Sequence, residues 1–191
     1  MKLIFIGGSF NPPHRGHYEI IQYCSKQCDQ LVLMPTAHSP LKNKTYSPKP
    51  HHILRMLELL IQDLNCSTQI DDWELLQSGP SYTYLTIQYL QQKYPESSIS
   101  MVIGADQLLK FQQWKNYKEI IHSVHIIGFN RADCNFIPLS EMNITWVEDF
   151  NVDISSEEIR EEIATGKLNA NDLILPVKDY ILGNNLYGYQ Q

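Results

Sequence analysis

The sequence predicts an α/β protein built on a parallel, doubly wound sheet. Short apolar runs typical of buried strands alternate with segments whose apolar residues recur at helical spacing. Strands and helices that alternate in short units favour parallel strands joined by right-handed helical crossovers. Residues 1–191 show no linker-like shift in composition, so we expect one domain that ends in helices.

The expected elements follow one another in a regular order. Apolar runs predict strands at Leu3–Ile6, Leu31–Met34, Ile99–Ile103 and Val124–Phe129, and a third strand is expected at Thr68–Ile70. Helical spacing predicts helices at Gly16–Gln27, His51–Leu64, Tyr82–Lys93, Ser155–Ala164 and Pro176–Asn184, with a loop over 36–50 and helical pieces between the last two strands. Ligands of such sheets bind at the carboxyl ends of the strands, where strand order reverses. Three segments fall at those ends: Gly7–His17, Pro35–Lys42 and Gly104–Asp106.

The segment Gly7–His17 joins the first strand to the first helix and reads GGSFNPPHRGH. Its glycines allow close approach of the backbone, and the N–H groups and helix dipole point at one spot, as in a phosphate cradle. His14 should lie just before the helix and His17 in its first turn, both facing one bound group. This spacing predicts chemistry on a phosphate. The alternatives are two polar residues at a wet helix start, or a metal pair, although zinc-binding histidines on one helix usually lie four apart.

A second segment is electrostatically unusual. No acidic residue occurs between Gln30 and Leu57. The same stretch contains Lys42, Lys44, Lys49, Arg55 and three histidines. In a chain of net negative charge this composition predicts a local positive field beside the cradle. The alternative is a solvated flexible loop, which charged, proline-rich segments often form.

Two readings apply to the segment that follows Ile154. Ser155 and Glu158 have the spacing of a capping box, which predicts a well-capped surface helix. Ser155, Ser156 and Arg160 could instead form a second anion site at the helix start. Glu157 and Glu158 count against the anion site because they add negative charge.

The segment Gly104–Asp106 also invites two readings. An aspartate at a strand end beside a nucleotide often bonds ribose hydroxyls, which gives Asp106 a candidate role. Trp114 could stack on an aromatic ligand or belong to the core, and the core is the commoner fate of tryptophan.

Composition excludes several other classes of protein. Apolar residues make up 43% of the chain, charged residues 19%, and the net charge is −6, which argues against general nucleic-acid binding. No apolar stretch approaches the roughly 20 residues of a membrane span, and the N-terminal run is too short for a signal peptide. We therefore expect a cytoplasmic protein with no membrane partner. Its four cysteines lack a C-x-x-C pair, which favours free thiols over a zinc site.

These segments together resemble a known family. Gly8–His17 resembles the G-[ST]-F-x-P-x-H-x-G-H motif of adenylyl- and cytidylyltransferases. The rest of the chain is similar to the bacterial nicotinate-nucleotide adenylyltransferases. The matching segments are Met34-Pro35, Pro40–Lys42, Arg55–Leu57, Gly79–Thr83, Ile103–Asp106, Trp114, Ile154–Arg160 and Leu182–Tyr187. The resemblance spans nearly the whole chain, and the combination is more specific than the first motif alone.

The resemblance implies a Rossmann-like nucleotidylyltransferase fold and a reaction. AMP would pass from ATP to nicotinate mononucleotide, forming deamido-NAD and pyrophosphate in NAD biosynthesis, with Mg²⁺. The implied ATP-binding residues are Gly7, Gly8, Ser9, Phe10, His14, His17, Gly104, Asp106, Ser155, Ser156 and Arg160, with His14 and His17 catalytic. The implied residues for the second substrate are Lys42, Thr83 and Trp114. The alternatives are transfer to nicotinamide mononucleotide or pantetheine phosphate, or nucleotide binding without turnover.

The sequence departs from that family at three positions. Leu41 stands where the family often has a histidine, Leu85 where an aspartate is common, and Glu157 where a threonine is usual. The resemblance implies that Glu157 weakens a phosphate contact, while Ser155, Ser156 and Arg160 remain.

Overall fold

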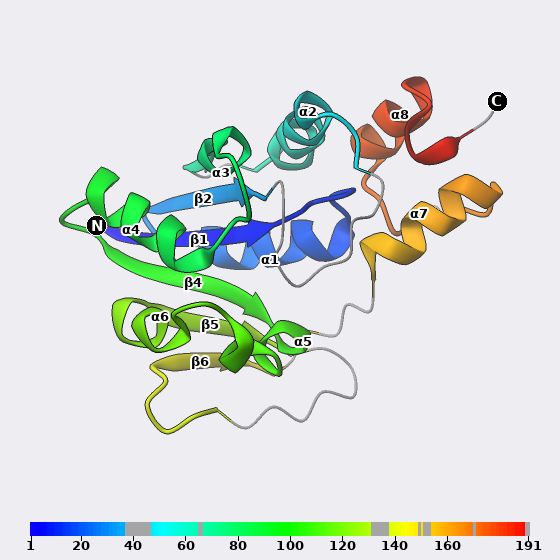
Figure 1. Ribbon diagram of the computed structural model, residues 1–191. Coiled ribbons are helices and arrows are strands. Elements are labelled where there is room, and N and C mark those ends of the chain that lie inside the picture. The colour runs from blue at the N-terminus through cyan, green and yellow to red at the C-terminus, as the bar shows by residue number, and fades with distance from the viewer. Residues whose placement is uncertain are drawn as a thin grey trace.

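The computed structural model describes residues 1–36, 47–64, 67–130, 138–148, 150, 154–169 and 171–189. Within them lies one six-stranded sheet of order β3-β2-β1-β4-β5-β6, with every neighbouring pair parallel (Figure 1). The strands are β1 (Lys2–Gly8), β2 (Gln30–Pro35), β3 (Thr68–Ile70), β4 (Ser98–Gly104), β5 (His125–Phe129) and β6 (Ile144–Val147). The predicted doubly wound parallel sheet is confirmed.

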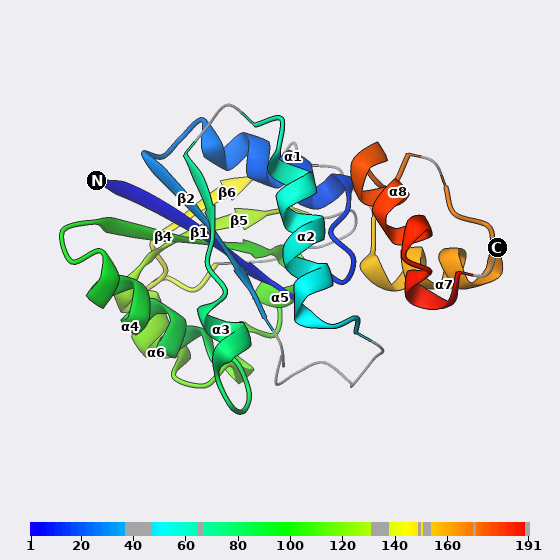
Figure 2. The ribbon, with the colours of Figure 1, turned by 90° about the horizontal axis from the view of Figure 1, so that it is seen from above.

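Helices cover both faces of this sheet, as the view from above shows (Figure 2). One face carries α1 (Arg15–Ser25) and α2 (Pro50–Ile61). The other carries α3 (Trp73–Leu76), α4 (Thr83–Lys93), α5 (Ala105–Leu108), the 3₁₀ turn η1 (Phe111–Gln113) and α6 (Tyr117–Ser123). The C-terminal elements α7 (Ser156–Thr165), α8 (Leu175–Gly183) and η2 (Leu186–Gly188) gather near the carboxyl ends of the strands.

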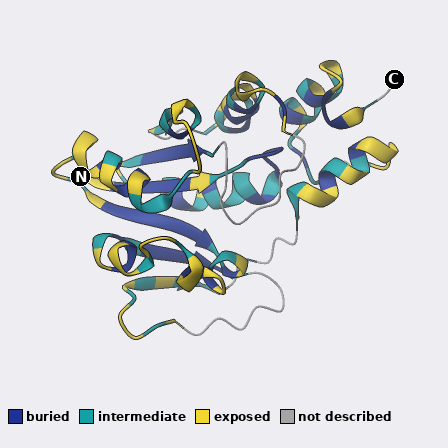
Figure 3. Cartoon of the chain, viewed as in Figure 1, coloured by how far each residue is buried: buried dark blue, intermediate teal, exposed yellow. Residues whose placement is uncertain are grey.

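The alternation of side chains along each strand divides the core into two layers. In β1, Ile4 and Ile6 join the cluster under α1 and α2, whereas Leu3 and Phe5 join the cluster under α4 and α6. Both sets are buried because helices cover both faces of the parallel sheet, so neither face is exposed to solvent. Burial is accordingly nearly continuous along the inner strands and interrupted along the helices (Figure 3).

Three elements were not predicted from the sequence. The four-residue helix α3 and the 3₁₀ turn η2 are too short to show a helical period. Strand β6 contains only Ile144–Val147, and none of its four residues is fully buried, so it lacks the apolar run of the inner strands. The helix predicted to reach Gln27 ends at Ser25, and Cys28 therefore lies beyond it. No helix among the described residues is long and apolar enough to cross a membrane.

Candidate active site

The reversal of strand order places two predicted segments side by side. Strands β1 and β4 are neighbours at the centre of the sheet, with Ile6 paired to Val102. The chain runs from β1 outward to β2 and returns to β4 on the other side, so the switch point lies between these two strands. Because β1 ends at Gly8 and β4 ends at Gly104, the glycine loop and the Gly104–Asp106 segment leave the sheet at its carboxyl edge together.

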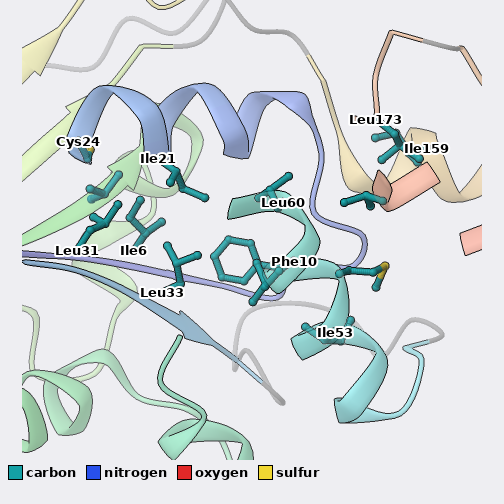
Figure 4. Close-up of a cluster of buried hydrophobic side chains, with 14 of the residues drawn as sticks. Ile6, Phe10, Ile21, Cys24, Leu31, Leu33, Ile53, Leu60, Ile159 and Leu173 are labelled. Atoms are coloured by element: carbon teal, nitrogen blue, oxygen red, sulfur yellow. The ribbon is translucent and has the colours of Figure 1, made fainter. Parts of the chain in front are cut away.

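The glycine loop is held from below by a buried aromatic ring. Phe10 is 1% exposed and packs in the cluster that also contains Leu33 and Leu60 (Figure 4). Its φ of 45° is in the left-handed region, which non-glycine residues rarely adopt. A Cβ built on Gly8 would lie 3.4 Å from the Phe10 ring, whereas one on Gly7 would meet nothing within 4 Å. The loop therefore presents backbone, and not the Phe10 side chain, to the space beyond the strand.

The two histidines form one compact unit at the start of α1. His14 is the N-cap residue and His17 the third helical residue, as predicted. Their ring centroids lie 3.8 Å apart with a 40° interplanar angle, and the His14 N–H donates to His17 Nδ1 at 3.2 Å. When Nδ1 accepts this bond in a neutral ring, the proton of His17 is on Nε2. Nε2–H of His17 is then a fixed hydrogen-bond donor on a half-buried ring.

Helix α7 is bonded directly to the glycine loop. The Arg160 Nη1 donates to the carbonyl of Asn11 at 2.7 Å and to the carbonyl of Ser156 at 3.1 Å. The Ser156 hydroxyl donates to the carbonyl of Pro12 at 3.0 Å. These bonds bring the N-terminus of α7, with its orphan N–H groups, against the loop that precedes the two histidines.

The structure shows the capped helix predicted at Ile154–Arg160, and the anion site stays a prediction. Ser155 is the N-cap of α7, and its hydroxyl oxygen accepts from the Glu157 N–H at 3.2 Å. The helix is therefore capped, with a bond to the second helical residue and not the reciprocal pair with Glu158. Glu157 and Glu158 are exposed. The capped end nevertheless lies at the glycine loop, where the anion-site reading requires it.

A second C-terminal segment also contacts the start of α1. The Arg15 N–H donates to the carbonyl of Asp172 at 2.9 Å, and Arg15 Nε donates to the carbonyl of Asn171. These acceptors are backbone carbonyls more than 150 positions along the chain, so sequence reasoning had no signal for them.

Asp106 folds back over the end of β4. Its Oδ1 lies 2.8 Å from the point where a Cβ on Gly104 would sit, and its Oδ2 accepts from Gln107 Nε2 at 2.9 Å. The exposed carboxylate beside the switch point is where the ribose prediction needs an acceptor.

The other two predicted substrate residues lie on the α4–α6 side of the sheet. Thr83 begins α4, and Trp114 follows η1 with its ring centroid 5.2 Å from that of Phe111. Trp114 is half-buried, so its ring combines a core contact with an accessible edge. Lys115 brings the two segments together, because its Nζ lies 4.5 Å from the centroid of the Tyr82 ring.

Only some of the basic residues that predict a positive field beside the cradle lie in the described part of the chain. Lys42 and Lys44 lie outside the described residues, and so does Leu41. Arg55 does not supply a free charge, because its Nη1 pairs with Glu58 Oε2 at 2.7 Å on the exposed side of α2. His52 is bonded to the Tyr180 hydroxyl at 2.9 Å, and burial, His51 and Lys49 lower its pKa, so it is mostly neutral at pH 7.

The cysteines of the described segments are free thiols. Cys24 is fully buried, and burial raises its pKa to about 12. Cys28 donates to the Cys24 carbonyl at 3.3 Å. Cys66 and Cys134 lie outside the described residues.

A glycine loop at a switch point, with two closely packed imidazoles at a helix start, is the arrangement expected of a nucleotide-handling site of the nucleotidyltransferase class. Residues 5–162 match the family model described as cytidylyltransferase-like. The chain is 32% identical over 202 residues to a probable nicotinate-nucleotide adenylyltransferase of Prosthecochloris aestuarii, covering 98% of each chain. It is 35% identical over 189 residues to a probable nicotinate-nucleotide adenylyltransferase of Leptospira interrogans, covering 95% of this chain and 94% of that one. The chain belongs to the nicotinate-nucleotide adenylyltransferase family, and it is an enzyme.

Solved structures share the same fold. The nicotinic acid mononucleotide adenylyltransferase of Plasmodium falciparum complexed with NaAD superposes with a TM-score of 0.82 at 19% identity, covering 100% of this chain and 99% of that one. A putative nicotinate-nucleotide adenylyltransferase from Vibrio parahaemolyticus gives a TM-score of 0.75 at 23% identity, covering 100% and 98%. The shared fold includes the Rossmann-like sheet and the C-terminal helices.

Proposed function

We propose that this site transfers AMP from ATP to nicotinate mononucleotide directly, with His14 and His17 as the catalytic residues. The observation that carries the proposal is the pair of closely packed imidazoles at the N-terminus of α1, beside the glycine loop at the switch point. The assignment of ATP and nicotinate mononucleotide as the substrates rests on the family to which the chain belongs.

The reaction needs positioning and charge stabilisation more than base catalysis. A phosphate oxygen of nicotinate mononucleotide attacks the α-phosphorus of ATP in line. A new P–O bond forms, the bond from the α-phosphorus to the bridging oxygen breaks, and its electrons leave with pyrophosphate. The nucleophile is already ionised, so no residue has to remove a proton. Preorganised donors that meet the charge developing on the phosphates supply the rate enhancement.

His17 is suited to that task by its hydrogen bond to His14. The bond to Nδ1 leaves Nε2–H as a donor of fixed direction, and a fixed donor needs little reorganisation in the transition state. The N-terminus of α1 adds the positive end of its dipole at the same place. The open space at Gly7 allows a phosphate to approach the backbone closely.

The remaining roles are those that the resemblance to the family implies. Ser155, Ser156 and Arg160 lie at the start of α7 against the loop and hold the ATP phosphates there. Gly104 and Asp106 contact the ribose. Lys42, outside the described residues, binds phosphate, and Thr83 with Trp114 holds the nicotinate ring.

Mg²⁺ accompanies ATP in this proposal. The described loop is rich in N–H donors and presents few carboxylates, so the phosphate oxygens and water supply most of its ligands. When bound, the ion neutralises charge on the phosphates.

Pyrophosphate release from ATP with a panel of acceptors tests the proposal. We expect release with nicotinate mononucleotide and much less with nicotinamide mononucleotide or phosphopantetheine. Release that requires either of the other acceptors would overturn the substrate assignment. Binding of ATP with no release for any acceptor would indicate a nucleotide-binding protein without turnover.

A further inference from the structure

A buried carboxyl group lies in α3, next to the connection that leads to Thr83, the proposed nicotinate-binding residue. Glu74 of α3 is 6% exposed, and its Oε1 accepts a hydrogen bond from the Thr86 hydroxyl of α4 at 2.5 Å. Thr86 is itself 1% exposed. The bond joins two helices that flank the connection 77–82, which contains the predicted Gly79–Thr83 motif.

Two further residues act on the same carboxyl. The side chains of Thr36, just after β2, and of Ser81 favour the charged form of Glu74 and so lower its pKa. Its Oε2 is buried and accepts no hydrogen bond from the described residues. The Thr36 N–H donates to the carbonyl of Gly8 at 2.8 Å. Thr36 therefore bonds the Gly8 end of the phosphate cradle and also acts on Glu74, whose hydrogen-bond partner Thr86 belongs to the first turn of α4.

Burial of this carboxyl is unfavourable in isolation. Desolvation is the main cause that raises the pKa of Glu74, and the neighbouring Asp71 acts in the same direction. An apolar side chain of similar size would avoid that cost. A polar group at this point is useful when several separate segments have to be held in one arrangement.

The tip of the connection 77–82 is open to solvent. Gln77, Ser78, Gly79 and Pro80 are all exposed, and Gly79 has a φ of 110°. Farther from the site, Asp71, which follows β3, accepts from Lys93 Nζ at 2.7 Å and from the Tyr89 hydroxyl at 3.0 Å. The Trp73 ring of α3 also stacks on the Tyr89 ring, with centroids 4.5 Å apart. These contacts hold the far part of α4, whereas Glu74 bonds Thr86 in its first turn.

We propose that Glu74 is a positioning residue for the mononucleotide, which aligns Ser81–Thr83 with the Gly8 end of the phosphate cradle. This inference rests on the proposed role of Thr83 in holding the nicotinate ring. Glu74 touches no substrate. It fixes the separation between the segment that holds the ring and the loop that holds the reacting phosphates.

Steady-state kinetics on four variants tests this role. We expect Glu74→Ala and Thr86→Val to raise the KM for nicotinate mononucleotide about tenfold, with kcat and the KM for ATP changed less than about threefold, because ~1.4 kcal/mol of lost alignment corresponds to tenfold. Glu74→Gln, a neutral isostere that can still accept from Thr86, should restore the KM to within about threefold of wild type. Lys93→Met is the matched control, since it removes the ion pair with Asp71 at the far end of α4 and should leave that KM unchanged.

Hydrogen exchange of the amides over 77–83, measured without ligand, separates this inference from the proposed function. We expect faster exchange there in Glu74→Ala than in Lys93→Met. Unchanged KM and unchanged exchange in Glu74→Ala, or an equal rise of KM in Lys93→Met, would overturn the positioning role. Faster exchange in an enzyme that does not use nicotinate mononucleotide would uphold the alignment of the segment and overturn the substrate assignment instead.

Discussion

Arg160 of α7 donates a hydrogen bond to the backbone carbonyl of Asn11, 149 positions earlier in the chain, at 2.7 Å. The acceptor belongs to the loop that leads to His14 and His17. The same guanidinium also bonds the Ser156 carbonyl, at the first residue of its own helix. Arg160 therefore sets where the N-terminus of α7 sits relative to the catalytic loop, in addition to its proposed contact with ATP.

Removal of the Arg160 side chain should affect ATP more than the second substrate. Arg160→Ala loses both hydrogen bonds of the guanidinium, and bonds to charged groups contribute about 1.5–3 kcal/mol each. We expect a KM for ATP raised at least about tenfold, and a lower free energy of unfolding. Arg160→Lys should recover only part, because a lysine cannot reproduce the planar fork. Steady-state kinetics and urea unfolding measure both effects.

Glu161→Ala is the control for that experiment, because Glu161 is an exposed residue of the same helix. It should leave both measurements near wild type. An unchanged KM for ATP in Arg160→Ala would show that the contact with Asn11 has no influence on the site.

Protonation of His52 should weaken the packing of α2 on α8. Burial lowers the pKa of His52 below 6.5, and the neighbouring charges of His51 and Lys49 act in the same direction. A lowered folded-state pKa means that the contribution of neutral His52 is present above about pH 6.5 and lost as the pH falls below it. We expect the stability of wild type to fall more steeply from pH 7.5 to 5.5 than that of His52→Gln, which does not titrate. Parallel curves would contradict this expectation.

Lys42 should act on binding more than on turnover. It lies outside the described residues, and its role as a phosphate ligand is a prediction from the sequence. Lys42→Ala should raise the apparent KM of a phosphate-bearing substrate several-fold while kcat changes less, as expected for uniform binding of ground and transition states. An unchanged apparent affinity for both substrates would show that Lys42 does not bind a phosphate of either one.

Cys24 should resist alkylation in the native protein. With a pKa of about 12, its thiolate fraction at pH 8 is about 10⁻⁴, and the side chain is fully buried. Iodoacetamide labelling followed by peptide mass spectrometry should modify Cys24 only after denaturation. Rapid labelling of the Cys24 peptide in native protein would show that α1 opens readily.

The sequence predicted the sheet well because the inner strands carry continuous apolar runs. Thr68–Ile70 has the predicted bounds, and the glycine loop, His14 and His17 stand where the pattern of a strand followed by a helix places them. Strand β6, which was missed, is a short, half-exposed edge strand without such a run. β3 lies at the other edge of the sheet and also lacks one, and its bounds were predicted nonetheless.

The contacts that organise the site were less accessible to sequence reasoning. Arg160 and Arg15 bond backbone carbonyls, which carry no residue-type signal. Glu74 belongs to none of the motifs singled out in the sequence, although in the fold it is buried beside Thr86. Arg55 reads as part of a basic field, although it pairs with Glu58 one turn along α2. Tertiary neighbours decided each of these cases.

The most direct test of the account is pyrophosphate release by His17→Ala with saturating ATP and nicotinate mononucleotide. His17 is half-buried at a helix start, so the variant should fold, and its circular dichroism spectrum should match wild type. We expect kcat to fall by about 10²–10³, the loss typical of one transition-state donor, with little change in either KM. A kcat within a few-fold of wild type would contradict the catalytic role of the imidazole pair.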